Sequence, residues 1–399
     1  MPPDRDRMES SIPPHVPPEL VYDFDFVADP LLTPDPHAGL LELRRRAPGL
    51  FFTPRHGGHW VAQSHAAVFH VVHDPATFSS TIRGYRPLPP INFDPPQHGL
   101  YRGALIQVFA PKNVSAMLPT IRELTLQLID KVAGSGRCDF VADIAEPLPV
   151  TIFMRMLGLP VEQMPAFRRA IVAFLKEADH AKGELLFEEL LRLIDPVLRA
   201  RQQERRDDMI SRLLDSQLGD RPPSWDEMQR YLLFLTTAGL DTVTNAMSFA
   251  MRHLALDGAL QDRLRADPGL IPIAIEEFLR RYAVSTILRT VTRDTDHGGV
   301  PLRAGDPVHV LIPAANLDPA VFDAPDQVIL DRDEPPLTFG AGIHRCLGSH
   351  LARLELRNVL TEWFARVPPF RLDPDDPPEL HAGLVYTVDR LPLLWDRAP

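Results

Sequence analysis

The ten residues Phe339-Gly-Ala-Gly-Ile-His-Arg-Cys-Leu-Gly348 decide the fold of this chain. Glycines on both sides of Cys346 permit a tight turn and a close backbone approach, and an amphipathic helical pattern follows directly after them. The pattern places Cys346 in a rigid loop at a helix start, where backbone N–H groups favour a thiolate. A thiolate held in this way is a good axial ligand for haem iron. The alternative is a buried, inert cysteine, a common state of a lone thiol.

The composition excludes several classes of protein. The chain has 399 residues and a formal net charge of −11, which argues against a nucleic-acid partner. It has only two cysteines, which argues for a reducing compartment and against a disulfide framework. The first residues lack the apolar segment of a secretory signal, and no apolar stretch is long enough to span a membrane. We therefore expect a cytoplasmic protein that does not bind nucleic acid or a membrane.

Local patterns predict a mainly α protein with small β-sheets. Helical periodicity fills residues 98–200 and 225–255 and the segment after Pro272, whereas short apolar runs typical of strands lie at 50–63, 285–312 and 383–395. Strands at both ends of a helical middle indicate an α-rich class with small β elements. Residues 1–20 are rich in proline and charge, so we expect a disordered tail there.

A long proline-rich loop covers residues 75–96. It carries Tyr85, Arg86 and Leu88 among other large side chains, so it is too apolar for plain disorder. Structureless loops of this length are usually functional. We interpret the loop as a wall of a substrate pocket, and the alternative is a loop that simply packs on the core.

The predicted helix at 225–255 has an unusual centre. Thr236, Thr237, Gly239, Asp241 and Thr242 are gathered where a buried helix would carry apolar side chains. A glycine inside a helix costs about 1 kcal/mol relative to alanine, and threonine hydroxyls compete for the carbonyl four residues earlier. We expect a kink at Ala238-Gly239 that opens a groove. The alternative is a helix with ordinary threonine hydrogen bonds.

A further helix carries Glu277 and Arg280, which are spaced to pair on one helical face. Taken alone this spacing is a weak signal, and an exposed ion pair of small energetic worth is the alternative.

Together these motifs resemble the cytochrome P-450 family. The cysteine loop resembles its haem-ligand loop, Ala238-Gly-x-Asp-Thr242 resembles its oxygen-binding groove, and Glu277-x-x-Arg280 resembles its buried structural ion pair. The likeness covers nearly the whole chain from about residue 40 and looks closest to the bacterial camphor-hydroxylase branch. Further segments that carry this likeness are Gly57-Gly-His-Trp60, Asp94-Pro-Pro96 and Leu391-Pro-Leu-Leu-Trp395. The resemblance implies one cytochrome P-450 catalytic domain over residues 21–399, with haem b between the long kinked helix and the helix of the cysteine loop.

The resemblance also implies roles for individual residues. Cys346 is the expected metal ligand, and Asp241 and Thr242 are the expected catalytic pair, because they help to deliver protons. The residues implied to contact the cofactor are His98, Arg102, Ala238, Gly239, Thr242, Arg289, Phe339, His344, Cys346 and Gly348. Among these, Arg102, Arg289 and His344 would bind the haem propionates, since arginine forms charge-assisted bonds to carboxylates.

The residues implied to line the substrate pocket are Tyr85, Arg86, Leu88, Phe234, Thr237, Ile287, Leu384 and Val385. The camphor enzymes hold a substrate carbonyl with a pocket tyrosine, but Arg86 occupies that position here, with Tyr85 beside it. This departure argues against camphor itself. The family also completes its Glu-Arg pair with an arginine or histidine, and this chain has Gln327 at that position. Either the network is neutral at its third member or another residue completes it.

The function implied is that of a monomeric haem-thiolate monooxygenase. It would hydroxylate a small hydrophobic substrate, such as a terpenoid or norisoprenoid, with dioxygen. The chain has no flavin or nicotinamide domain, so electrons would come from a two-iron, two-sulfur ferredoxin served by a ferredoxin reductase. We expect the ferredoxin to dock on the Cys346 side, near Arg102, Arg345, Arg353 and Arg357. Two alternatives are a haem-based binding or sensing protein and the same fold catalysing another reaction, such as C–C cleavage or dehydration.

Overall fold

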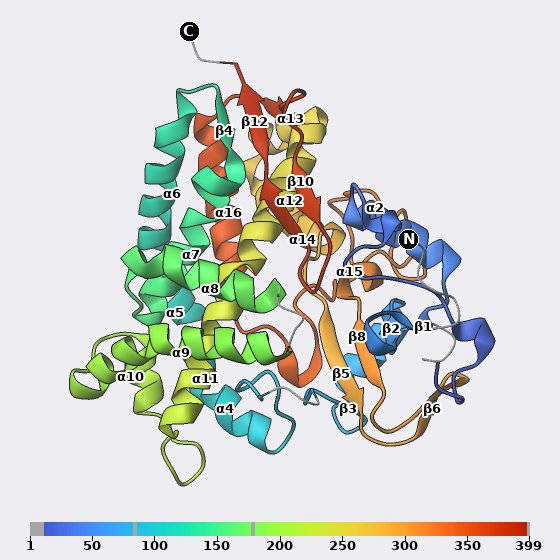
Figure 1. Ribbon diagram of the computed structural model, residues 1–399. Coiled ribbons are helices and arrows are strands. Elements are labelled where there is room, and N and C mark those ends of the chain that lie inside the picture. Colours follow the sequence, from blue (N-terminus) through green and yellow to red (C-terminus); the bar gives the residue numbers. More distant parts are fainter. Residues whose placement is uncertain (1–11, 83–85, 177–179, 397–399) are drawn as a thin grey trace.

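The structure is a computed structural model that describes residues 12–82, 86–176 and 180–396. Its larger part is helical, and strands occupy one side and one end of the molecule (Figure 1). The helices that form the larger part are α4 Gln97–Ile106, α6 Leu118–Ala133, α7 Pro147–Leu157, α8 Met164–Lys176, α9 His180–Gln203, α11 Trp225–Leu240, α12 Thr242–Leu256, α14 Ile271–Arg281 and α16 Ser349–Arg366. Shorter α-helices are α2 Pro36–Arg46, α3 His65–His73, α5 Pro111–Ala116, α10 Met209–Leu214, α13 Gly258–Ala266 and α15 Ile312–Ala315. The predicted fold class is confirmed.

The strands form four small sheets. The largest has the order β1-β2-β8-β5-β3, with β2 and β8 parallel and the other neighbours antiparallel. Its strands are β1 Leu50–Thr53, β2 His59–Ala62, β3 Phe78–Ser79, β5 Ile287–Val291 and β8 Pro307–Val310. The others are β4 Arg137–Asp139, β6 Thr295–His297, β7 Val300–Leu302, β9 Phe370–Leu372, β10 Glu379–His381, β11 Thr387–Arg390 and β12 Pro392–Trp395. The sheets therefore join segments that are far apart in the sequence, and the largest one holds β5 beside the helical part.

The core is built around α16, which packs against α6 and α14. Trp363 of α16 is fully buried, and its ring meets Phe140, Phe370 and Trp395 edge-on at centroid distances of 5.3, 5.7 and 5.6 Å. Edge-to-face packing at such distances is the favoured arrangement of aromatic rings. The helix that follows the cysteine loop is thus anchored at its far end by both the helical core and a sheet.

The predicted long central helix is two helices, α11 and α12, which follow one another through the middle of the molecule (Figure 1). A capping box formed by Ser224 and Glu227 starts α11. The helices meet at Asp241, whose backbone has φ −119° and ψ −32°. The break therefore lies at Asp241, two residues beyond the predicted kink at Ala238-Gly239. The hydroxyl of Thr242 still donates to the carbonyl of Ala238 at 3.3 Å, so the break and the threonine bond coexist.

Gly239 has a packing role. A Cβ atom at this position would lie 2.4 Å from Cε1 of Phe153 on α7, closer than real contacts allow. The glycine therefore lets α11 approach α7 closely.

Part of the segment for which a disordered tail was predicted, residues 12–20, lies within the described residues and packs on the protein. Residues 1–11 lie outside the described residues, but Val16 is only 6% exposed and joins the core beside the largest sheet. Its neighbour His15 lies 2.9 Å from the Asp306 carboxylate. The apolar contact of Val16 and this polar contact hold residues 12–20 on the sheet. In the described ranges, no helix combines the length and the apolar character that a bilayer span requires.

Candidate active site

The loop before α16 holds Cys346 by hydrogen bonds and glycine geometry. Gly340 and Gly342 both have φ of +64°, a conformation that favours glycine. A Cβ at Gly342 would also lie 2.5 Å from the carbonyl oxygen of Val72, so the loop packs tightly on the end of α3. The Cys346 N–H donates to the Phe339 carbonyl at 2.8 Å, and α16 begins three residues later. The predicted cysteine loop at a helix start is therefore present.

The thiol of Cys346 is accessible, yet it lies deep enough in the protein for desolvation to dominate its pKa. Burial raises the pKa above its usual value, while the N–H groups of Gly348 and Ser349 and the guanidinium groups of Arg102 and Arg345 lower it. The sequence analysis expected these donors to favour the thiolate, but here the cost of burying the charge is larger. A coordinated metal ion would supply the missing positive charge, since it deprotonates a coordinating thiol outright.

Four basic side chains converge near this loop. Arg289 of β5 is 6% exposed, and burial lowers its pKa to about 10 although the charge of Asp94 opposes the change. The rings of His98 and His344 meet at a centroid distance of 4.3 Å. Burial and the charges of Arg289, His98 and Arg102 together lower the pKa of His344 to about 3. The structure thus brings together His98 and the three residues for which propionate contacts were predicted, Arg102, Arg289 and His344.

This basic cluster suits a bound anion. The Nε2 atom of His98 is buried and has no hydrogen-bond partner among the described residues. Arg289 donates to the carbonyl of Leu288, its own neighbour, at 2.7 Å. Buried groups of this kind are costly unless they are paired. Carboxylates placed here would pair with the guanidinium group of Arg289 and with His98, so the donor set fits the two acidic groups of haem b.

One group of residues near the junction of α11 and α12 is partly or fully accessible. Its residues recur at helical spacing and are Phe234, Thr237, Ala238, Asp241 and Thr242. Their neighbours Leu233, Leu235 and Thr236 are buried. The predicted oxygen-groove residues Ala238, Asp241 and Thr242 therefore share one accessible face with two predicted pocket residues, whereas Gly239 packs against α7.

The remaining predicted pocket residues come from three segments. Ile287 begins β5, and Val385 bridges to Ser285 just before that strand, so Leu384 and Val385 lie beside it. Leu384 is a large apolar residue, yet it is 41% exposed. Leu88 is partly buried against the core that includes α11. Tyr85 lies outside the described residues.

Arg86, which was predicted to line the pocket, pairs with an acidic residue of α9. It is exposed, its guanidinium group lies 3.0 Å from the carboxylate of Glu188 on α9, and it also covers the ring of Phe187. The acidic partner neutralises the charge that the sequence analysis placed at the pocket wall. Arg86 thus ties the proline-rich loop to α9, a contact that the local sequence does not reveal.

The Glu277–Arg280 pair is buried and has a third member. Arg280 forms two bonds to the Glu277 carboxylate, at 2.7 and 2.8 Å, and Arg332 reaches the same carboxylate at 2.8 Å. Gln327 contributes only its backbone carbonyl, which accepts from Arg280 at 2.8 Å. Of the two possibilities left open by the sequence, the network is therefore completed from elsewhere, by Arg332.

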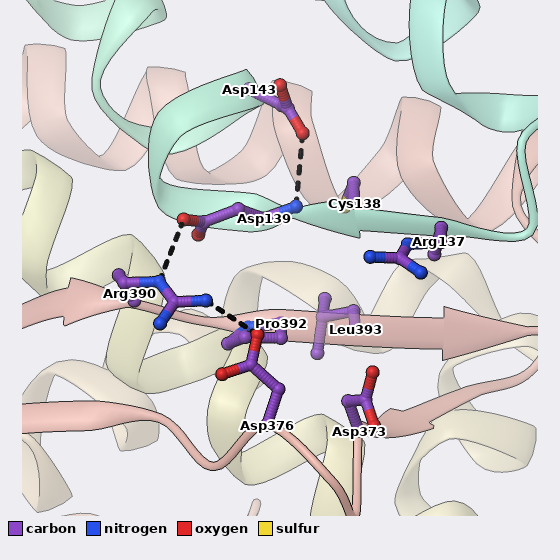
Figure 2. Close-up of a pocket in the computed structure, with 9 residues that line it drawn as sticks. All are labelled: Arg137, Cys138, Asp139, Asp143, Asp373, Asp376, Arg390, Pro392 and Leu393. Carbon is purple, nitrogen blue, oxygen red and sulfur yellow. Dashed lines mark hydrogen bonds and ion pairs between the residues drawn. The ribbon is translucent and has the colours of Figure 1, made fainter.

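A separate pocket lies well away from these residues, between β4, β12 and the segment before β10 (Figure 2). Its volume is about 290 Å³, and Arg390 crosses it to pair with Asp139 and Asp376. The residues that line it are Arg137, Cys138, Asp139, Asp143, Asp373, Asp376, Arg390, Pro392 and Leu393. None of the predicted site residues is among them, and no described group of histidine, cysteine and acidic residues is arranged to hold a metal ion. The candidate active site is therefore the region around Cys346.

Comparisons with known proteins agree with this assignment. The family described as "Cytochrome P450" matches residues 270–384. A relative from Sinorhizobium fredii, "Probable cytochrome P450 127A1", is 32% identical over 98% of this chain and 99% of its own length. The chain belongs to the cytochrome P-450 family.

The solved structures of CYP101J2 and CYP101C1 superpose on this P-450 with TM-scores of 0.88 and 0.88 and identities of 36% and 34%. Each match covers 96% of this chain, and they cover 99% and 100% of the two solved chains. These neighbours confirm the predicted resemblance to the camphor-hydroxylase branch. This P-450 is therefore a haem-thiolate monooxygenase that acts on a substrate with dioxygen and a redox partner.

Two site residues of this P-450 escaped the sequence analysis. Ser80 lies 2.8 Å from Nε2 of His344 across 264 sequence positions, and no local pattern marks it. Arg332 lies five residues beyond the aligned Gln327, within Asp331-Arg-Asp333. An arginine between two acidic residues close to that position was a signal that could have led to it.

Proposed function

We propose that Cys346 is the axial ligand of haem b and that Arg102, Arg289, His98 and His344 hold its propionates. The accessible thiol at the start of α16 supports the first assignment. The convergence of four basic groups with an unpartnered buried nitrogen on His98 supports the second. Phe339 and Gly348 frame the thiol from either side: the Phe339 carbonyl accepts from the Cys346 N–H, and Gly348 begins the turn into α16.

Asp241 and Thr242 are the proposed proton-delivery pair. They stand at the break between α11 and α12, on the accessible face that also carries Ala238. The bound haem supplies the activation of dioxygen, and a carboxyl group and a hydroxyl beside it can hold and pass protons. A protein that only bound or sensed a ligand would not need this pair. The pair at the helix break therefore favours catalytic turnover.

Replacing Thr242 by alanine is expected to uncouple the enzyme. The hydroxyl that donates to the Ala238 carbonyl at 3.3 Å is lost, and with it a group able to orient a proton donor. Most reducing equivalents should then appear as hydrogen peroxide, with product per electron pair falling by about 10-fold or more. Peroxide and product are measured together in a reconstituted system.

A matched control is Thr236→Val in the same helix. The Thr236 hydroxyl is buried and donates to the Leu232 carbonyl at 2.6 Å, away from the accessible face. This variant should stay coupled. Tight coupling in Thr242→Ala would contradict the proposed role of Thr242.

The proposed substrate is a small hydrophobic molecule, a terpenoid or norisoprenoid, which the enzyme hydroxylates. The described residues proposed to face it, Leu88, Phe234, Thr237, Ile287, Leu384 and Val385, are apolar except for one threonine. The Arg86 charge is paired with Glu188, so a charged substrate group has no evident partner there. Apolar walls with few polar groups select compact apolar ligands. Screening terpenoids for a low-to-high-spin shift of the haem, followed by product analysis, tests both the substrate class and the reaction type.

Electrons are proposed to come from a two-iron, two-sulfur ferredoxin that docks beside the cysteine loop. Arg345 and Arg357 are exposed there, whereas Arg353 is occupied by Glu276 and the ring of Phe339. Arg102 donates to the Arg345 carbonyl, which helps to place that loop residue. Exposed basic groups of this kind raise association rates with an acidic partner and lose their effect at high salt.

Charge reversal of Arg345 and Arg357 to glutamate should therefore slow reduction by ferredoxin by about 10-fold or more at low salt. Stopped-flow reduction at several ionic strengths measures the change. Arg371→Glu is the control, because Arg371 is an exposed arginine on β9 and belongs neither to the cysteine loop nor to α16. Equal reduction rates in the double variant and the control would reject this docking surface.

A further inference from the structure

His309 is a fully buried histidine in the middle of β8 that the proposed chemistry does not use. On the neighbouring strand it pairs with Leu288, so it lies on the face of the sheet opposite to that of Ile287 and Arg289. Burial, together with the nearby rings of His59 and His56, lowers its pKa to about 3. The imidazole is therefore neutral at physiological pH and carries a single N–H group.

The proton on this ring can be assigned from the hydrogen bonds. Nε2 of His309 lies 2.7 Å from the hydroxyl oxygen of Thr286. That hydroxyl donates to the carbonyl oxygen of Leu384 at 3.0 Å, so its one proton is already used. His309 must then donate through Nε2–H. Its Nδ1 atom consequently has no proton, and this atom is buried without a partner among the described residues.

The hydrogen bonds that run from His309 through the Thr286 hydroxyl, here called the His309–Thr286 relay, end on one carbonyl oxygen, that of Leu384. The Leu384 oxygen accepts from both the N–H and the hydroxyl of Thr286, at 2.9 and 3.0 Å. The two residues after Leu384 also pair with the segment before β5. Val385 forms a β-bridge with Ser285, and the Tyr386 N–H donates to the Val284 carbonyl at 2.8 Å. In addition to these backbone bonds, the Thr286 hydroxyl, which is held by His309, binds the backbone of Leu384. The side chain of Leu384 is 41% exposed.

We propose that His309 is a positioning residue for substrate selection, which acts through the Thr286 hydroxyl to hold the Leu384–Val385 segment. The proposal rests on the proposed function, in which Leu384 and Val385 line the substrate pocket. His309 reaches the pocket from the far face of the sheet and through one intermediate side chain. It sets the shape of the pocket wall without contacting the substrate, and its proton is not transferred.

The test uses the haem-loaded enzyme and two readouts that do not depend on turnover. The first is hydrogen exchange of residues 382–386, and the second is spectral titration with 4-phenylimidazole as a probe of the space above the haem. Thr286→Val and His309→Phe should each speed exchange and weaken probe binding by about three- to tenfold, the usual effect of losing one buried hydrogen bond. Thr286→Ser keeps the hydroxyl and should restore both values to those of the parent enzyme.

Two controls separate the possible failures. Thr125→Val removes another buried threonine hydroxyl, which donates to Ile121 within α6, and should change neither readout. Leu384→Ala tests the pocket wall directly. If Leu384→Ala alters probe binding but Thr286→Val and His309→Phe do not, the relay is overturned while the proposed pocket stands. If Leu384→Ala also leaves probe binding unchanged, the pocket assignment fails and the positioning role fails with it.

The effect should also be independent of pH. Because the His309 pKa is lowered to about 3, the ring does not titrate between pH 6 and 8. The ratio of probe affinities between His309→Phe and the parent enzyme should therefore be constant over that range. A ratio that changed through the usual histidine pKa would show that His309 titrates in this range and contradict the neutral ring with an unprotonated Nδ1.

Discussion

Replacing Cys346 by serine is expected to abolish the thiolate-type carbon monoxide difference spectrum and all monooxygenase turnover. Serine keeps the size of the side chain, but it cannot supply the anionic sulfur that donates electron density to haem iron. The buried site adds to the loss, because it already raises the pKa of the native thiol and would oppose an alkoxide even more strongly. The spectrum of the reduced, carbon monoxide-bound protein measures the change, together with haem content.

The second cysteine provides the matched control. Cys138 lies buried in β4, and its pKa is raised by burial and by the carboxylates of Asp139 and Asp143. Cys138→Ala should retain the full thiolate spectrum, with at most a modest loss of stability. A thiolate spectrum that survives in Cys346→Ser and disappears in Cys138→Ala would overturn the central assignment.

The sequence predicted the parts of this site that depend on local chemistry. The glycines at 340 and 342 permit the positive φ that the loop adopts, and the helix after Cys346 follows from its own apolar pattern. The break in the central helix was predicted because polar side chains conflict with a buried helix. Its position at Asp241 was not, because the packing of Gly239 against Phe153 on another helix keeps α11 regular through the predicted kink.

The contacts that the sequence did not predict are long-range ones. Ser80 meets His344 across 264 positions, and Arg86 meets Glu188 across 102. Such pairs are decided by how β3 and α9 come to lie beside the cysteine loop and the proline-rich loop. The sequence singled out His344 and Arg86, but no local pattern marks their partners Ser80 and Glu188. In the sequence, His309 is one of several histidines in segments with a strand pattern. The register of β5 and β8 is what places it beside Thr286.

Arg332 illustrates the same limit within the ion-pair network. The aligned position holds Gln327, and the sequence left open whether the network was neutral or completed by another residue. The segment folds so that the Gln327 carbonyl accepts from Arg280, while Arg332 donates to Oε1 of Glu277, the oxygen that also accepts from Arg280. Position along the chain was therefore a poor guide to which side chain carries the third charge.

Replacing Glu277 by glutamine is expected to lower the free energy of unfolding by about 3–5 kcal/mol, the usual cost of removing one partner from a buried ion pair. The change leaves Arg280 and Arg332 as two like charges, 1% and 9% exposed at their side chains, around a neutral amide. The damage should reach the haem site. Arg280 donates to the Asn316 carbonyl, and the Asn316 side chain bonds to Leu337 and Thr338, directly before Phe339. Urea unfolding and haem retention together measure both effects.

The adjacent residue supplies a control of the same chemistry in a different environment. Glu276 pairs with Arg353, but their side chains are 43% and 29% exposed, so solvent screens the pair. Glu276→Gln should therefore cost no more than about 1 kcal/mol. Gln327→Ala should be nearly neutral, because the backbone carbonyl that accepts from Arg280 remains. Two results would contradict a stabilising role of the three-charge network at the cysteine loop. One is a loss of unfolding free energy in Glu277→Gln no larger than that in Glu276→Gln. The other is an equal loss in Gln327→Ala and Arg332→Ala.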